Sequence, residues 1–374
     1  MKGKILFVAS VMEHIIAFHL PYLEWFKSQG YEVHVAAKAE KGFFSDVIDV
    51  FHDIDFKRTP YSLGNISAYK KLKSIINTNH YSIIHCHTPM ASVLTRLAGI
   101  GTRKQGSKML YTAHGFHFYK NGPISGWMLY YPIEKFLSYF TDAIITINEE
   151  DFEALHKYKF KCGGKYLVPG IGVNTAPIKI STPELKSKLR REYGYDEDAF
   201  ILFYAAEFIY RKNHKLIIES IPYLKDAIPN LKVVLAGRGE LLDECIELAE
   251  KLNIRKYVDF LGFRRDIPKL VALSDVGVSS SRQEGLGITL AEDMFAGLPV
   301  VATKDRGHNE MIVDGYNGFF FGQDNKEEFC DRILKLYNSS ELRHLMGNNA
   351  LLSIQKFSIE NSLKEHINIY RKYL

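Results

Sequence analysis

Short apolar runs alternate with amphipathic stretches along the whole chain, and this alternation restricts the fold more than any other feature. Residues 5–9 and 32–36 read as strands, and residues 19–29 between them have the apolar spacing of a helix. Strands that alternate with helices form parallel sheets covered by helices, so the pattern predicts an α/β fold. Further strands of the first half are expected at 81–85, 108–112 and 143–147.

The same pattern restarts in the second half. A stretch rich in Gly, Pro and Thr at 168–183 separates the halves, and a length of 374 residues favours two domains. We therefore expect two doubly wound, Rossmann-like domains, residues 1–172 and 173–358. An amphipathic helix over 359–374 ends the chain; its pattern fits either domain, and we assign it to the first. Ligands of such folds bind beyond the carboxyl ends of the strands, so we expect the active site in a cleft between the domains.

Composition excludes several classes of protein. The formal net charge is only +5 and no Lys/Arg cluster resembles a binding arm, which argues against a nucleic-acid partner. The N-terminus reads as a strand, and no apolar run reaches the roughly 18 residues of a membrane helix. We expect a cytoplasmic protein that, if it meets a membrane, lies peripherally on the inner face of the plasma membrane. The cysteines are far apart and form no CxxC, which fits a reducing compartment: Cys86, Cys162, Cys245 and Cys330.

Two acids near a predicted helix start carry the strongest signal. Glu284 lies in the loop after a strand, and Glu292 lies about one turn inside the following helix. Backbone N–H groups at a helix N-terminus suit a phosphate, and carboxylates beside it suit the hydroxyl groups of sugars on either side of a diphosphate. The alternative is a capping Glu284 and a solvated Glu292. The backbone groups belong to Gly285, Leu286, Gly287, Ile288 and Thr289.

Two further loops of the second half fit an anionic ligand. Arg211 and Lys212 precede a helix, where two cations can neutralise a diphosphate; the alternative is a solvated basic loop. Gly237 and Gly239 form a Gly-x-Gly turn after a strand, which alone is weak evidence for a nucleotide site.

The segment EGLGITLAEDMFAGLPVVATKDRGHNEMIVDGYNGFFF resembles the donor-site signature of the retaining glycosyltransferases of the GT-B fold, in the family usually numbered four. The resemblance extends over essentially the whole chain. It implies that Glu292 binds the donor ribose, that Glu284 approaches the transferred sugar, and that Lys212 and Arg211 hold the diphosphate. It also implies that Gly237 and Gly239 face the nucleotide, and that backbone groups of Gly262, Phe263 and Arg264 cradle the base. Glu207 departs from the family, in which many members have Arg.

The first half resembles the subgroup that acts in capsule, exopolysaccharide and lipid-linked glycan assembly, through the string HGFHF. This implies that His114, assigned with Glu284 to the catalytic residues, contacts the transferred sugar or its acceptor, and that His117 lies on the acceptor side or is structural. From the residues alone, His114 could equally be a loop histidine with a local partner. Residues 10–21 form a loop without the glycines of many members, and Glu13 and His14 are assigned there to acceptor tuning. We expect no bound metal, since His85 and His87 lack further ligands in the sequence.

We therefore expect a UDP-dependent hexosyltransferase that moves a hexose or N-acetylhexosamine, with retention, to a hydroxyl of an undecaprenyl-diphosphate-linked glycan. No cofactor is expected beyond the UDP-sugar co-substrate. The sequence offers no nucleophile, which favours a front-face mechanism. Residues 116–140 are either a helix with a buried aromatic face or a membrane-surface patch of the N-terminal domain. A nucleotide-sugar epimerase and a non-catalytic binding subunit of the same fold stay open as alternatives.

Overall fold

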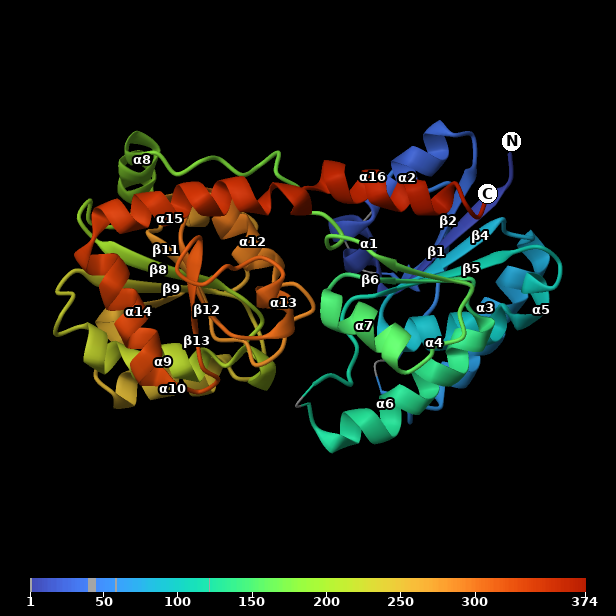
Figure 1. Cartoon of the computed structure of the whole chain (residues 1–374), viewed down its shortest axis with the longest axis horizontal. Coiled ribbons are helices and arrows are strands. Elements are labelled where there is room, and N and C mark those ends of the chain that lie inside the picture. Colours follow the sequence, from blue (N-terminus) through green and yellow to red (C-terminus); the bar gives the residue numbers. More distant parts are fainter. Residues whose placement is uncertain (1, 40–44, 58, 121) are drawn as a thin grey trace. The chain divides into compact units, whose positions relative to one another are not determined.

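The computed structural model describes residues 2–39, 45–57, 59–120 and 122–374. The chain divides into two compact units: unit 1 comprises Met1–Gly172 and Ile359–Leu374, and unit 2 comprises Val173–Ser358. Each unit contains one sheet of parallel strands with helices on both faces (Figure 1). The predicted fold class, two Rossmann-like α/β domains, is confirmed.

Unit 1 has a seven-stranded sheet in the order β3-β2-β1-β4-β5-β6-β7. All pairs are parallel, and β1 lies between β2 and β4. Successive residues of a strand point to opposite faces, so β1, β2, β4, β5 and β6 each supply residues to two apolar clusters. The strands are β1 (Lys4–Val11), β2 (Glu32–Lys38), β3 (Val50–Asp53), β4 (Ile83–Cys86), β5 (Lys108–Ala113), β6 (Ala143–Thr146) and β7 (Gly164–Leu167).

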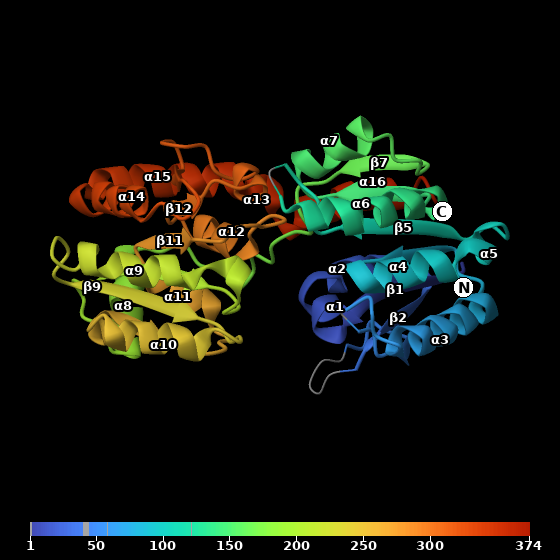
Figure 2. The same ribbon diagram turned by 90° about the horizontal axis from the view of Figure 1, so that it is seen from below.

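Helices from distant parts of the chain cover the two faces of this sheet. One apolar cluster joins the sheet to α3 (Gly64–Asn79), α4 (Pro89–Ala98) and α7 (Glu149–Lys157) (Figure 2). The other joins it to α1 (Met12–Phe18), α2 (Leu20–Ser28) and α16 (Ile359–Tyr370). The short α5 (Ile100–Arg103) follows α4.

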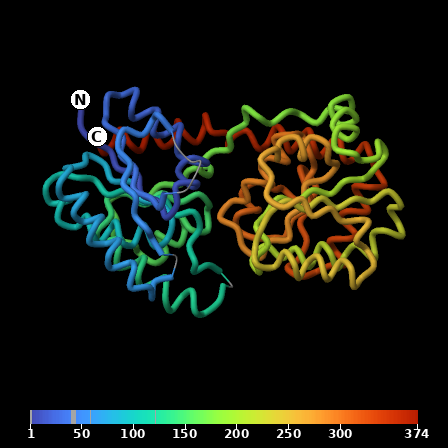
Figure 3. Tube along the Cα trace, turned by 180° about the vertical axis from the view of Figure 1, so that it is seen from behind, coloured from blue at the N-terminus to red at the C-terminus, as the bar shows by residue number. Residues whose placement is uncertain are grey.

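The C-terminal helix α16 is part of the core of unit 1. It lies beside α2, so the last residues of the chain run next to its first helices (Figure 3). The buried Tyr22 hydroxyl donates to the carbonyl of Ile171 at 2.7 Å and contacts Ser362 Oγ at 2.9 Å. Tyr370 is fully buried, and its hydroxyl lies 3.0 Å from Nδ1 of His85.

The segment 12–18 differs from the sequence prediction, which placed a loop at 10–21. Strand β1 continues to Val11, and α1 begins at Met12. Met12 and Ile15 are buried against the sheet, so their three-residue spacing gives the segment a helical apolar face. The absence of glycine is consistent with this helix.

Unit 2 has a six-stranded parallel sheet in the order β10-β9-β8-β11-β12-β13. The strands are β8 (Phe200–Ala205), β9 (Leu231–Ala236), β10 (Val258–Phe260), β11 (Val276–Ser279), β12 (Val300–Thr303) and β13 (Gly318–Phe321). One face packs against α9 (His214–Leu224), α10 (Leu242–Lys251) and α14 (Lys326–Asn338). The other packs against α8 (Pro183–Tyr193) and α11 (Ile267–Leu273). The remaining helices are α12 (Ile288–Phe295), α13 (Arg306–Asn309) and α15 (Ser340–Ser353).

Helix α6 (Ile124–Leu137) has one anchored face and one exposed apolar face. On the inner face Glu134 accepts two hydrogen bonds from the fully buried Arg96, at 2.8 and 3.0 Å. Removing one partner of such a buried pair typically destabilises a protein by about 3–5 kcal/mol, so the pair fixes α6 on α4. The outer face carries Ile124, Met128 and Phe136, which are 75%, 76% and 57% exposed. The helix predicted within 116–140 is confirmed, and one of its faces is buried; the membrane-surface patch stays a prediction.

No helix within the described residues has the length and hydropathy of a membrane span.

Candidate functional site

The strand order of unit 2 reverses between β8 and β11. Crossovers from these two neighbouring strands leave in opposite directions, and ligands of doubly wound folds bind beyond the carboxyl ends at such a point. The loop after β8 contains Arg211 and Lys212, and the loop after β11 contains Glu284. The fold therefore brings together residues that are more than seventy positions apart in the sequence.

Glu284 is the centre of a hydrogen-bonded network. Its carboxylate is buried, forms an ion pair with Nζ of Lys212, and lies 3.4 Å from Arg211. The Ser281 hydroxyl donates to the same carboxylate at 2.6 Å. The backbone N–H of Glu284 donates to the side chain of Asp305. Arg211 and Lys212, which are predicted to hold the diphosphate, are thus ion-pair partners of Glu284, which is predicted to approach the transferred sugar.

Opposing effects set the charge of Glu284. Burial raises the pKa of this carboxyl group, but the charges of Lys212 and Arg211 lower it more, to about 2. Glu284 is therefore an anion at neutral pH. A second negative group brought here would have to share or replace its cations.

Glu292 has a different environment, although it lies only one turn inside α12. Among the residues that the structure describes, no cation pairs with this side chain, and burial raises its pKa to about 7. The neighbouring Asp293 is buried, and burial raises its pKa well above the usual value. Gly287 begins α12 with φ of 96°, which lets the chain turn directly into the helix. The predicted backbone donors at 285–289 therefore lie at the start of a two-turn helix.

Three strand-end loops are joined next to this site. The N–H of Gly237 donates to the carbonyl of Gly262 at 2.8 Å, and the N–H of Phe208 donates to the carbonyl of Arg238 at 2.9 Å. Gly237 and Gly239 have φ of 153° and 156° and approach the chain after β8 closely. This explains both glycines as packing requirements, which are compatible with a nucleotide site but do not require one.

Of the predicted base-contacting residues, Phe263 is exposed and Arg264 has an intramolecular partner. The Arg264 guanidinium donates to both oxygens of Asp266, at 2.8 and 2.5 Å. Its side chain is thus occupied, which leaves only its backbone for the predicted role. Glu207 is exposed in the loop after β8.

In unit 1 the strand order reverses between β1 and β4, and histidines gather at that point. His14 follows β1, His87 follows β4 and His114 follows β5. Nδ1 of His87 lies 3.3 Å from Nε2 of His114, and the rings of His19 and His87 are 3.9 Å apart. Burial lowers the pKa of His14 to about 4. Burial and mutual proximity lower the pKa of the other three well below the usual value, so all four are neutral at pH 7.

The other predicted acceptor-side residues lie differently. Glu13 is half-buried on α1 next to His14. His117 is exposed, and its ring lies 4.6 Å from that of Tyr130 on α6, not with the four histidines. His85 has partners for both nitrogens, Tyr370 at 3.0 Å and Thr112 at 2.8 Å, so it has a structural role.

Several residues of these networks were not predicted from the sequence. Ser281 and Asp305 support Glu284, and the serine run before the loop was a signal that could have suggested this. His19 was assigned only to the start of a helix. Thr88 has φ of 60° and accepts a hydrogen bond from the N–H of Ser10, which ties the ends of β1 and β4 together. A non-glycine residue in this conformation is typical of functional sites, but only coordinates reveal it.

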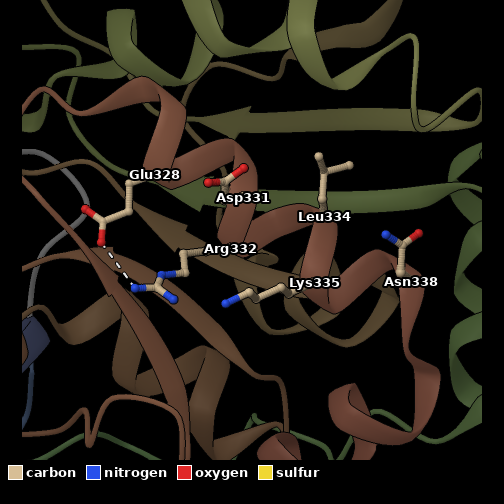
Figure 4. Close-up of a pocket in the computed structure, with 6 residues that line it drawn as sticks. All are labelled: Glu328, Asp331, Arg332, Leu334, Lys335 and Asn338. Carbon is tan, nitrogen blue, oxygen red and sulfur yellow. Dashed lines mark hydrogen bonds and ion pairs between the residues drawn. The ribbon is translucent and has the colours of Figure 1, made fainter.

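A surface pocket along α14 contains none of these residues (Figure 4). Its cations already have partners: Arg332 pairs with Glu328 at 3.2 Å, and Arg332 and Lys335 lie over the ring of Phe319. It has no polar groups converging on one point, so we assign it no role.

The chain is similar to known glycosyltransferases. The family model described as glycosyl transferases group 1 matches residues 186–352, and the model described as glycosyl transferase 4-like matches residues 4–148. A glycosyltransferase function is ascribed to EpsD of Bacillus subtilis (strain 168). EpsD is 44% identical to this chain, and the alignment covers 100% of this chain and 98% of EpsD. A UDP-Gal:alpha-D-GlcNAc-diphosphoundecaprenol alpha-1,3-galactosyltransferase of Escherichia coli is 25% identical over 94% of this chain and 92% of its own.

Solved structures share the fold. HepE of Anabaena, in complex with UDP and glucose, superposes with a TM-score of 0.81 at 21% identity and covers 100% of both chains. WaaG, a glycosyltransferase involved in lipopolysaccharide biosynthesis, gives a TM-score of 0.76 at 19% identity, with 98% of this chain and 99% of its own covered.

The Gly237 turn allows a structural prediction. A Cβ at this position would lie 1.9 Å from the carbonyl oxygen of Ala206, so Gly237→Ala must displace the loop after β8. We expect thermal unfolding to show a loss of about 2–3 kcal/mol. Gly194→Ala is the matched control, because its φ of 75° is also positive but no atom lies within 4 Å of the added Cβ. An equal effect of both substitutions would show that backbone strain, not packing, accounts for the loss.

Proposed function

Because the chain belongs to the glycosyltransferases of the GT-B fold and matches the group 1 and 4-like family models, we propose the following reaction. The protein transfers a hexose or N-acetylhexosamine from a UDP-sugar to a hydroxyl of an undecaprenyl-diphosphate-linked glycan, with retention, in capsule or exopolysaccharide synthesis. The observation that carries the proposal is the joining of Lys212, Arg211 and Glu284 at the strand-order reversal of unit 2.

In the proposed donor complex the diphosphate takes the place of Glu284 as the partner of the two cations. The N–H groups at the start of α12 add hydrogen bonds and the positive end of a helix dipole. Glu284 is then released to accept hydrogen bonds from hydroxyls of the transferred sugar, and Glu292 accepts those of the ribose. Because these groups suffice to neutralise a diphosphate, we propose that donor binding needs no metal.

The proposed chemistry uses the donor as its own base. The bond between the anomeric carbon and the diphosphate oxygen breaks, and the acceptor oxygen bonds to the same face of that carbon. The acceptor proton passes to the departing diphosphate, whose negative charge Lys212 and Arg211 stabilise. His114 is neutral, so its ring can exchange a hydrogen bond with a sugar hydroxyl at no charge cost.

Two observations support a lipid-linked acceptor. The Escherichia coli relative is named for a diphosphoundecaprenol acceptor and a UDP-Gal donor. In unit 1 the exposed stripe of α6 aligns Ile124, Met128 and Phe136 on one helix face. A helix with such a face lies in the interfacial plane of a bilayer. We therefore propose that unit 1 docks on the membrane through α6.

The reaction is tested with UDP-linked hexoses and N-acetylhexosamines and a polyprenyl-diphosphate-linked sugar. We expect UDP release only when donor and acceptor are both present, with an α-linked product by NMR. Glu292→Ala should weaken UDP binding about 10–100-fold, since it removes hydrogen bonds to a charged group. Glu284→Ala should lower kcat about 10²–10³-fold with a smaller effect on UDP affinity.

The control variant is Glu219→Ala on α9, which removes a carboxylate paired with Lys326 and should change neither quantity. Isomerised sugar without acceptor would instead identify an epimerase, and donor binding with neither reaction would identify a binding subunit. Intact-mass detection of a sugar on any carboxylate would disprove the front-face mechanism.

Glu292 predicts a pH dependence of donor binding. With a pKa of about 7 it is mostly protonated at pH 6 and mostly ionised at pH 8, and only the carboxylate can accept both ribose hydrogen bonds. The ionised fraction rises about tenfold over this range, so calorimetry should show UDP-glucose affinity rising by up to about tenfold. Glu292→Gln should bind more weakly and show no such rise; an unchanged rise in that variant would assign it to another group.

The α6 stripe predicts membrane binding. Met128→Glu with Phe136→Glu should lower co-sedimentation with phosphatidylglycerol vesicles at least tenfold, because each side chain loses about 1.5–3 kcal/mol of burial. Leu345→Glu with Leu352→Glu is the matched control, since these leucines of α15 are 57% and 71% exposed. Equal losses in both double variants would mean that added charge, not α6, controls binding.

A further inference from the structure

Four imidazoles form one contiguous cluster beyond the carboxyl ends of β1, β4 and β5. His14, His19 and His114 come from the segments after β1 and β5. The ring of His87 contacts the rings of His19 and His114. His19 and His87 are buried, whereas His14 and His114 are half-buried and form the outer edge. The residues of the cluster all belong to unit 1.

The spacing of three of these rings fits a shared ligand. One ring nitrogen from each of His14, His19 and His114 lies within 4.8 Å of the others, so some point lies no more than about 2.8 Å from all three. Two imidazoles on one tetrahedral zinc ion, with Zn–N of about 2.1 Å, have ring centres about 5 Å apart. The observed ring separations are 5.0 Å for His14–His114, 5.1 Å for His14–His19 and 6.0 Å for His19–His114.

The nitrogens of the cluster have unused capacity. Within the described residues, Nε2 of His14, of His19 and of His87 is buried with no hydrogen-bond partner. Buried polar atoms nearly always have a partner, and the unpartnered Nε2 atoms of His14 and His19 leave two nitrogens of the cluster available to a ligand. The imidazoles are uncharged at neutral pH, which is the form that binds metals. His85 is excluded as a ligand, because both of its nitrogens have protein partners.

We propose that His14, His19 and His114 bind one transition-metal ion of the zinc class through their imidazole nitrogens. Three neutral histidines leave a fourth position, which the half-buried edge formed by His14 and His114 opens to an oxygen ligand. His87 contacts His114 and orients its ring. The inference does not rest on the proposed transferase reaction, although a metal-bound His114 could not use the same nitrogen for a sugar.

The test measures Zn²⁺ binding to the full-length, chelator-treated protein, without donor or acceptor, by competition with a chromophoric chelator. We expect one Zn²⁺ per chain, and Co²⁺ in its place should give the absorption bands of a four-coordinate site. His14→Ala and His19→Ala should each weaken Zn²⁺ binding at least tenfold. His14 lies at the edge, so its variant decides the test if the core variant His19→Ala fails to fold.

His52→Ala is the matched control. Nε2 of His52 lies 3.1 Å from Nδ1 of His34 in the same unit. Both nitrogens of His34 already have partners, Tyr81 for Nδ1 and Glu32 for Nε2. Zn²⁺ binding should be unchanged in this variant. The proposal is wrong if the wild-type protein binds no stoichiometric Zn²⁺, if binding survives both cluster substitutions, or if His52→Ala weakens it as much as they do.

Discussion

In each sheet the strand order reverses once, and this reversal determines where polar side chains can meet. The chain leaves two neighbouring parallel strands toward opposite faces, so the space beyond their carboxyl ends stays open to loop residues. In unit 2 the loops after β8 and β11 place Lys212 next to Glu284. In unit 1 the helix α1, which directly follows β1, and the loop after β4 bring His14 and His87 together. The same topological constraint thus gives one unit a charged centre and the other a neutral one.

Burial shifts the pKa of all of these groups, and the charges beside each group determine whether it is ionised at neutral pH. Glu284 keeps its charge because Lys212 is in contact with it, whereas Glu292 loses much of its charge at neutral pH because burial is not offset. Burial lowers the pKa of the clustered histidines, so they stay neutral. Two glutamates eight positions apart therefore enter the proposed reaction with different properties, one as a cation-bound anion and the other as a group poised near pH 7.

The sequence predicted the features that depend on local pattern and missed those that depend on tertiary contact. Alternating strands and helices predicted both sheets, and Glu284 and Glu292 were placed in the correct loop and helix. The ion pair of Glu284 with Lys212 was not predicted, because the sequence cannot show that a cation faces a carboxylate more than seventy positions away. The grouping of His19 with His114 was missed for the same reason. The family resemblance was correct, while the residue roles inferred from it stay predictions.

The placement of α16 has a consequence for how the chain is made. Unit 2 is one continuous segment, but the core of unit 1 contains Tyr370, which is synthesised last. Until that residue leaves the ribosome, His85 lacks this partner for Nδ1, and Phe26 of α2 lacks its ring contact with Tyr370. Unit 2 can therefore fold before α16 is synthesised, whereas unit 1 cannot complete its core until α16 is available. His85 contacts His87 of the histidine cluster, so the cluster also gains its full set of contacts only after α16 has packed on unit 1.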